Sequence, residues 1–132
     1  MIRINIEFKG EPDIPSSYLS FEYIDKIDEI TFYNLVNMIQ RKLSRNLKIN
    51  LYETLVIYSS YITGELRSKK PIIDIQKNAK KLLLADNVMI GVPNMLRRII
   101  FQVKLDNDDH FTEVLFEKPL DIHQYILASD PG

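Results

Sequence analysis

The residues best suited to chemistry in this chain of 132 residues are its basic side chains, which gather in the middle of the sequence. Between Arg41 and Lys104 there are 13 basic and 4 acidic residues, whereas the two flanking parts together hold 4 basic and 14 acidic residues. The formal net charge of −1 hides this division. Charged residues ordinarily occupy solvated surface, so a plain surface explanation stands beside a functional one. The functional hypothesis is a basic surface that binds an anionic partner, with RNA as the favoured partner.

Eleven of the basic residues are candidates for contacts to phosphate, because guanidinium forks and ammonium groups suit phosphate oxygens. Arg41, Arg45 and Lys48 have the spacing i, i+4 and i+7, which predicts one shared helix face. Tyr58 and Tyr61 could stack on an exposed base, although core packing is favoured for Tyr58. The complete candidate set for RNA binding is Arg41, Arg45, Lys48, Arg67, Lys69, Lys70, Lys77, Lys80, Lys81, Arg97 and Arg98.

Motifs for catalysis, metal binding and nucleotide binding are missing from the sequence. The two histidines, His110 and His123, have no recognised ligand spacing, and a structural or solvent role is favoured for both. The carboxylates at 106–109 resemble part of a calcium loop but lack its glycine and its distal glutamate. There is no cysteine and no glycine-rich phosphate loop. The sequence therefore predicts no enzymatic activity, no cofactor and no metal.

Hydrophobic periodicity predicts the elements that must position these residues. Residues 2–8 alternate apolar and polar side chains, which indicates a half-buried strand, and 18–25 indicate a second one antiparallel to it. A helix is predicted from about residue 28, with one apolar stripe made by Phe32, Leu35, Val36, Ile39, Leu43 and Leu47. Further strands are predicted at 54–61, 81–84 and 97–103, with another at 111–116.

This order of elements favours an α+β fold of the ubiquitin-like β-grasp type, with a mixed sheet packed on one main helix. The prediction places the β-grasp domain at residues 1–104. Residues 105–132 form a C-terminal extension, with the possible extra strand and a mobile tail.

The location predicted from composition is the cytoplasm. The alternating pattern of residues 2–8 is unlike a signal peptide, and no apolar stretch approaches the roughly 20 residues of a membrane span. The lack of cysteine also favours an intracellular setting.

The segment 81–101 is similar to the end of ubiquitin-like domains. Lys81 is followed by three leucines, an acidic turn at Asp86, a Gly91-Val92 step and the apolar strand 99–101. It resembles a small eukaryotic ubiquitin-like family that includes the microsporidian dormancy factor of the ribosomal exit site. The resemblance extends loosely over residues 2–104.

The resemblance implies a ribosome hibernation factor. Such a domain would occupy the tRNA exit site, contact rRNA and small-subunit proteins there, and block translation sterically as a monomer off the ribosome. The basic middle of the chain would suit a phosphate-lined site. The alternative is a non-conjugating ubiquitin-like adaptor that binds another protein through its sheet or a strand edge.

Overall fold

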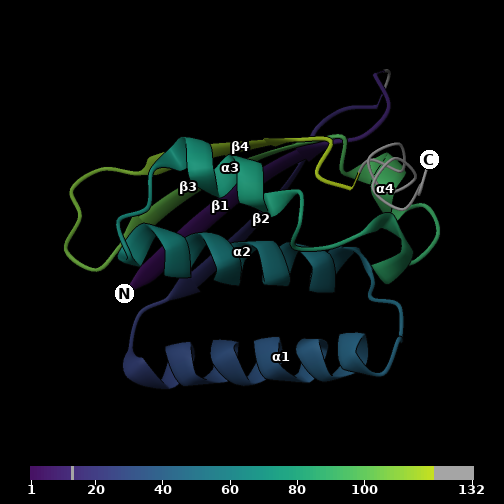
Figure 1. The fold of residues 1–132 in the computed structure, drawn as a ribbon. Coiled ribbons are helices and arrows are strands. Elements are labelled where there is room, and N and C mark those ends of the chain that lie inside the picture. Colours follow the sequence, from purple (N-terminus) through teal and green to yellow (C-terminus); the bar gives the residue numbers. More distant parts are fainter. Residues whose placement is uncertain (13, 121–132) are drawn as a thin grey trace.

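The computed structural model describes residues 1–12 and 14–120, in which two strands precede the helices and two follow them (Figure 1). The strands are β1 (Ile2–Lys9), β2 (Ser17–Tyr23), β3 (Arg98–Leu105) and β4 (Thr112–Glu117). The helices are α1 (Lys26–Ser44), α2 (Leu51–Arg67), α3 (Ile72–Ala79) and the single-turn α4 (Val92–Met95), with a 3-10 turn, η1, at Ala85–Asn87. The predicted α+β class is confirmed.

The strands form one sheet in the order β2-β1-β3-β4, and every neighbouring pair is antiparallel. Ile4 in β1 lies opposite Phe21 in β2 on one side and Val103 in β3 on the other. The prediction of a mixed sheet on one main helix, as in a β-grasp, is therefore corrected. The physical reason lies in the connection, because α2 and α3 take the chain back along α1 and forward again, so that β3 begins beside the end of β1 and runs antiparallel to it (Figure 1).

Helix α1 begins where the sequence predicted, because a capping box closes its first turn. Asp25 Oδ1 accepts a hydrogen bond from the Asp28 backbone N–H at 2.8 Å, and the Asp28 carboxylate accepts from the Asp25 N–H in return. The buried face carries Phe32, Val36 and Ile39, as the periodicity predicted. The helix ends at Ser44, so Leu47 lies beyond it and is exposed.

Helix α2 replaces the strand that the sequence indicated at 54–61. Residues 53–59 are all buried, because α2 lies between the sheet and α1 (Figure 1). A helix covered on both sides is apolar all round and loses the 3.6-residue periodicity that marks a surface helix. Its start is fixed by Asn50, whose Oδ1 accepts a hydrogen bond from the Glu53 N–H at 2.8 Å.

The remaining segments complete the sheet and its cover. The predicted short strand at 81–84 is wrong, since these residues form a turn and an extended link between α3 and η1. Strand β4 lies at the segment where a further strand was indicated, and Val114 and Phe116 contribute to the same core as β1 and α2. The division of the chain into 1–104 and 105–132 stays a prediction, and the tail at 121–132 lies outside the described residues.

Candidate interaction surface

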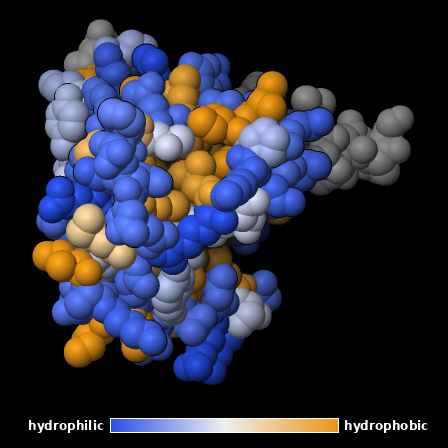
Figure 2. All heavy atoms as spheres, turned by 90° about the vertical axis from the view of Figure 1, so that its left-hand side faces the viewer, coloured by the Kyte–Doolittle hydropathy of each residue, from blue (hydrophilic) through white to orange (hydrophobic). Residues whose placement is uncertain are grey.

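The outer face of α1 exposes three large apolar side chains among polar ones such as Asn34 and Arg41. Ile27, Ile30 and Met38 are 73%, 52% and 59% exposed, and their spacing puts them on the side of the helix opposite Phe32 and Val36. Figure 1 shows α1 as the outermost layer, with α2 on its inner side. On the face drawn in Figure 2, apolar side chains reach the surface at the bottom of the view, where α1 begins. Exposed apolar residues grouped on one helix face are typical of a surface that contacts another protein.

A second apolar surface lies at the opposite end of the molecule, around the connection from η1 to α4. Gly91 has φ = 94° there, a left-handed conformation that glycine adopts without strain. This turn leaves Ile90 fully exposed and Met89 half exposed.

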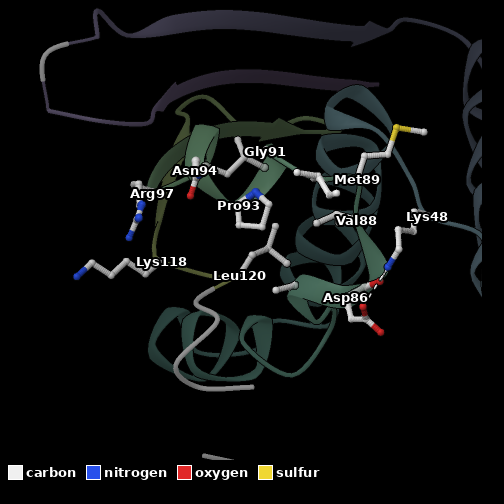
Figure 3. A pocket seen from close by; sticks show the side chains of 13 residues that line it. Lys48, Asp86, Val88, Met89, Gly91, Pro93, Asn94, Arg97, Lys118 and Leu120 are labelled. Atoms are coloured by element: carbon white, nitrogen blue, oxygen red, sulfur yellow. Dashed lines mark hydrogen bonds and ion pairs between the residues drawn. The ribbon is translucent and has the colours of Figure 1, made fainter. Parts of the chain in front are cut away.

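Beside this turn lies a pocket of about 300 Å³ (Figure 3). Its apolar lining includes Val88, Pro93 and Leu120, and Lys48, Arg97 and Lys118 supply cations. Lys48 is already engaged, because its Nζ donates to the Asp86 backbone oxygen at 2.6 Å and to Asp86 Oδ1 at 3.0 Å. The pocket therefore combines an apolar floor with a mostly basic edge.

The tip of the β1–β2 hairpin packs against the same connection. The Arg97 backbone N–H donates to the Lys9 oxygen at 3.0 Å. A Cβ placed on Gly10 would lie 2.4 Å from the Asn94 backbone oxygen, so only glycine fits at this position without a shift. The first strands of the chain therefore hold the 92–97 segment in place.

At the other end of α2, Arg67 joins three elements. Its Nη2 lies 3.2 Å from Glu29 Oε1 in α1 and 3.1 Å from Asp106 Oδ1 in the β3–β4 turn, and its Nη1 donates to the Tyr33 hydroxyl at 3.1 Å. Burial acts to lower the pKa of the Arg67 guanidinium, but the hydrogen bonds to Asp106 and Glu29 outweigh it and raise the pKa above its ordinary value. Arg67 thus has a structural role that its sequence neighbours do not reveal.

The structure does not bring the eleven candidate basic residues into one surface. Arg41 and Arg45 lie at the end of α1, while Arg67 lies beside the start of that helix. Arg45 caps α1, so Lys48 lies beyond the helix and the predicted face of three residues is wrong for Lys48. The other candidates lie after α2 (Lys69 and Lys70), in and after α3 (Lys77, Lys80 and Lys81) and around the start of β3 (Arg97 and Arg98). Whether any of them contacts an anion stays a prediction.

The candidates for base stacking and metal binding can also be placed. Tyr58 is fully buried in the core, as favoured, and Tyr61 donates its hydroxyl to the Ile75 backbone oxygen at 3.0 Å. His110 is exposed in the β3–β4 turn, and His123 falls outside the described residues. Within residues 1–12 and 14–120, no three His, Cys, Asp or Glu side chains are grouped so that they could hold a metal ion. Nor is any helix in this part long and apolar enough to span a membrane.

Comparison with known proteins decides the family. The model of a family described as "Urease, gamma subunit" matches residues 23–116, from the last residue of β2 into β4. This chain belongs to the urease gamma subunit family. The predicted resemblance to a ubiquitin-like family is therefore wrong.

Individual relatives agree with the family match. Urease subunit gamma of Halalkalibacterium halodurans is 32% identical over 81 residues, which cover 61% of this chain and 79% of the relative. Urease subunit gamma of Shewanella halifaxensis is 28% identical over 93 residues, covering 70% of this chain and 91% of the relative. Urease subunit alpha of Helicobacter heilmannii is 25% identical over 75 residues, covering 56% of this chain and 32% of that longer protein.

These findings overturn the functional predictions drawn from the resemblance. Ribosome hibernation, occupation of the tRNA exit site, translation inhibition and a ubiquitin-like adaptor role are all contradicted by the urease gamma match. The predicted partners, rRNA and small-subunit proteins, are contradicted with them. The resemblance fails at the segment 81–101, because residues 81–84 form no strand and Gly91 and Pro93 begin the short helix α4. A urease gamma chain is by name a subunit of an enzyme, so the prediction of no enzyme is corrected to that extent.

Sequence reasoning missed the apolar outer face of α1. Its signal was present, because Ile27, Ile30 and Met38 fall outside the predicted apolar stripe and are repeated at helical spacing.

Proposed function

We propose that this chain is a structural, non-catalytic subunit of a urease-type enzyme assembly. The observation that carries the proposal is the match of the urease gamma family to residues 23–116, which include α1, α2, α3, α4 and β3. In this role the chain supports the catalytic subunit and contributes no reacting group. A cytoplasmic location is part of the same proposal.

The partners in this proposal are the alpha and beta subunits of the same enzyme. Two surfaces of the chain support such contacts: the outer face of α1, with Ile27, Ile30 and Met38, and the exposed turn at Met89 and Ile90. Each leaves large apolar side chains in water, and burying such side chains against a partner stabilises an interface by roughly 25 cal/mol per Å² before the costs of association.

Co-purification tests the proposal. The full chain, carrying an affinity tag, is co-expressed with the urease alpha and beta subunits encoded in the same genome, and the complex is isolated and assayed for urease activity. We expect the three chains to elute together with urease activity. Alpha and beta subunits that assemble fully while this chain elutes alone would reject the proposal.

Two sets of substitutions locate the contact. Ile27→Asp with Ile30→Asp places charge on the outer face of α1, and we expect it to release the chain from the complex. Asn5→Asp is the control, because Asn5 is exposed on the sheet away from α1 and its cross-strand neighbours, Ser20 and Gln102, are uncharged. Circular dichroism checks that all variants remain folded.

A further inference from the structure

Strand β2 is an edge strand of the described sheet. It pairs with β1 along Ser17–Tyr23, and its backbone makes no other hydrogen bond to any residue that the structure describes. Its outward N–H and C=O groups form a row that another strand can pair with. The edge formed by β4 is different, since Gln76 of α3 donates to the Leu115 backbone oxygen at 2.9 Å and covers it.

The hairpin that carries this edge is an addition to the family core. The urease gamma match begins at Tyr23, so it leaves out β1 and the rest of β2. Yet Ile2, Ile4 and Ile6 of β1 are at most 1% exposed and β1 is an inner strand of the sheet. The hairpin is therefore firmly built into the fold, and the edge at β2 is a surface that the matched family core does not contain.

Strand β2 carries few of the features by which edge strands usually resist pairing, with Glu22 as its one charged residue. Residues 17–23 include no lysine, proline or glycine, and Tyr18 is 74% exposed. Large apolar side chains also stand in solvent at both ends of the strand: Ile14 before it and Ile24 after it are both more than half exposed.

We propose that β2 pairs with β2 of a second copy of this chain, antiparallel about a twofold axis at Ser20. Because the axis passes through Ser20, Tyr18 of one copy lies opposite Glu22 of the other, and Leu19 lies opposite Phe21. Leu19 and Phe21 already point to the helix-covered side of the sheet, so their pairing extends the core.

The charges fit the same register. Glu22 is the only charged residue in β2, and its carboxylate already accepts a hydrogen bond from Arg3 Nε of the same chain at 2.9 Å. No carboxylate faces another, so the pairing avoids the repulsion that directly opposed like charges would cause. The product is one continuous sheet across two copies. If the proposed function holds, this sheet would join two urease assemblies, but the pairing of β2 does not depend on that function.

A single cysteine tests the register directly, because the natural chain has none. Ser20→Cys places two thiols opposite each other across the axis, at the 4.5–5.5 Å Cα separation of antiparallel pairs, within the range that a disulfide spans. We expect mild oxidation of the isolated full chain to give a covalent dimer. The matched control is Asn5→Cys, which lies beside Ser20 on β1, one strand away from the interface, and should remain monomeric.

A second variant tests the interaction without a crosslink. Ser20→Lys places two ammonium groups opposite each other at the axis, and we expect the dimer to dissociate at least tenfold more readily in sedimentation experiments, with Asn5→Lys unchanged. Thermal melts check that the variants remain folded. A monomeric wild type at every concentration, or equal crosslinking of the two cysteine variants, would overturn the proposal while leaving the urease gamma assignment intact.

Discussion

Lys42 Nζ lies 2.6 Å from Glu53 Oε2, and this contact joins the last turn of α1 to the first turn of α2. The other carboxylate oxygen of Glu53 accepts a hydrogen bond from the Asn50 N–H at 3.0 Å, so one side chain caps α2 and binds α1. Glu53 is only 8% exposed. Its two roles explain why a charged residue is tolerated at the start of an otherwise apolar helix.

We expect Glu53→Gln to lower the free energy of unfolding by about 1 kcal/mol at neutral pH, since the charge-assisted bond is lost while Lys42 is half exposed. Burial acts to raise the pKa of Glu53, but the hydrogen bonds from Lys42 and the Asn50 N–H outweigh it and lower the pKa. A lowered carboxyl pKa contributes stability that is complete above the unfolded-state pKa of about 4.3 and is lost as pH falls through the folded-state value. Urea unfolding should therefore show the difference from wild type closing in acid.

The control for Glu53 is the ion pair of Lys48 with Asp86, which is exposed on both sides. Asp86→Asn should change the free energy of unfolding by less than about 0.5 kcal/mol at any pH. If the two variants lose the same free energy of unfolding, the contact of Lys42 with Glu53 stabilises the protein no more than an exposed ion pair does.

Gly10→Ala and Gly64→Ala should change stability in opposite directions. The new methyl group at Gly10 meets the Asn94 backbone oxygen at 2.4 Å, so the hairpin tip must move away from the 92–97 segment. We expect a loss of about 1–3 kcal/mol. A methyl group at Gly64 meets nothing within 4 Å, and this residue lies inside α2, so a gain of about 0.5–1 kcal/mol is expected. Thermal unfolding measures both, and an unharmed Gly10→Ala protein would show that the close approach is not needed.

Tyr58→Phe should leave the protein equally or more stable. The Tyr58 hydroxyl is buried and has no hydrogen-bond partner among the described residues, which is an unfavourable environment for a polar group. Tyr61→Phe is the matched comparison, because it removes the bond from α2 to the Ile75 oxygen of α3, and it should cost about 1 kcal/mol. Chemical denaturation of the two variants compares them, and a large loss for Tyr58→Phe would mean that its hydroxyl is satisfied after all.

Arg67→Met should destabilise the protein by about 1 kcal/mol at low salt, because the contacts to Glu29, Asp106 and Tyr33 are lost together. The loss should shrink as salt rises, since Asp106 is more than half exposed and screening weakens its attraction. Arg3→Met, which removes the exposed pair with Glu22, should have a smaller effect. Urea denaturation at two salt concentrations separates these outcomes.

Parts of the surface could be recognised in the sequence and others could not. Ile27, Ile30 and Met38 lie at helical spacing outside the core stripe, so the sequence was sufficient to predict that these three apolar side chains are exposed. The grouping of basic residues along the chain was misleading, because α2 runs back along α1 and places Arg67 beside Glu29, far from Arg41. Basic residues that are grouped along the sequence, such as Arg41 and Arg67, therefore lie at opposite ends of the antiparallel pair α1 and α2.

The sequence by itself determined the elements that have one buried and one exposed face. Strand β1 and helix α1 were predicted because a period of two or 3.6 residues appears only when one side meets the core and the other meets water. The tertiary structure alone decided the state of residues 54–61, since a segment buried on every side shows no period and its β-branched residues suit either state. The direction of β3 was also decided by the tertiary structure, because α2 and α3 take the chain out and back before β3 begins beside the end of β1 (Figure 1).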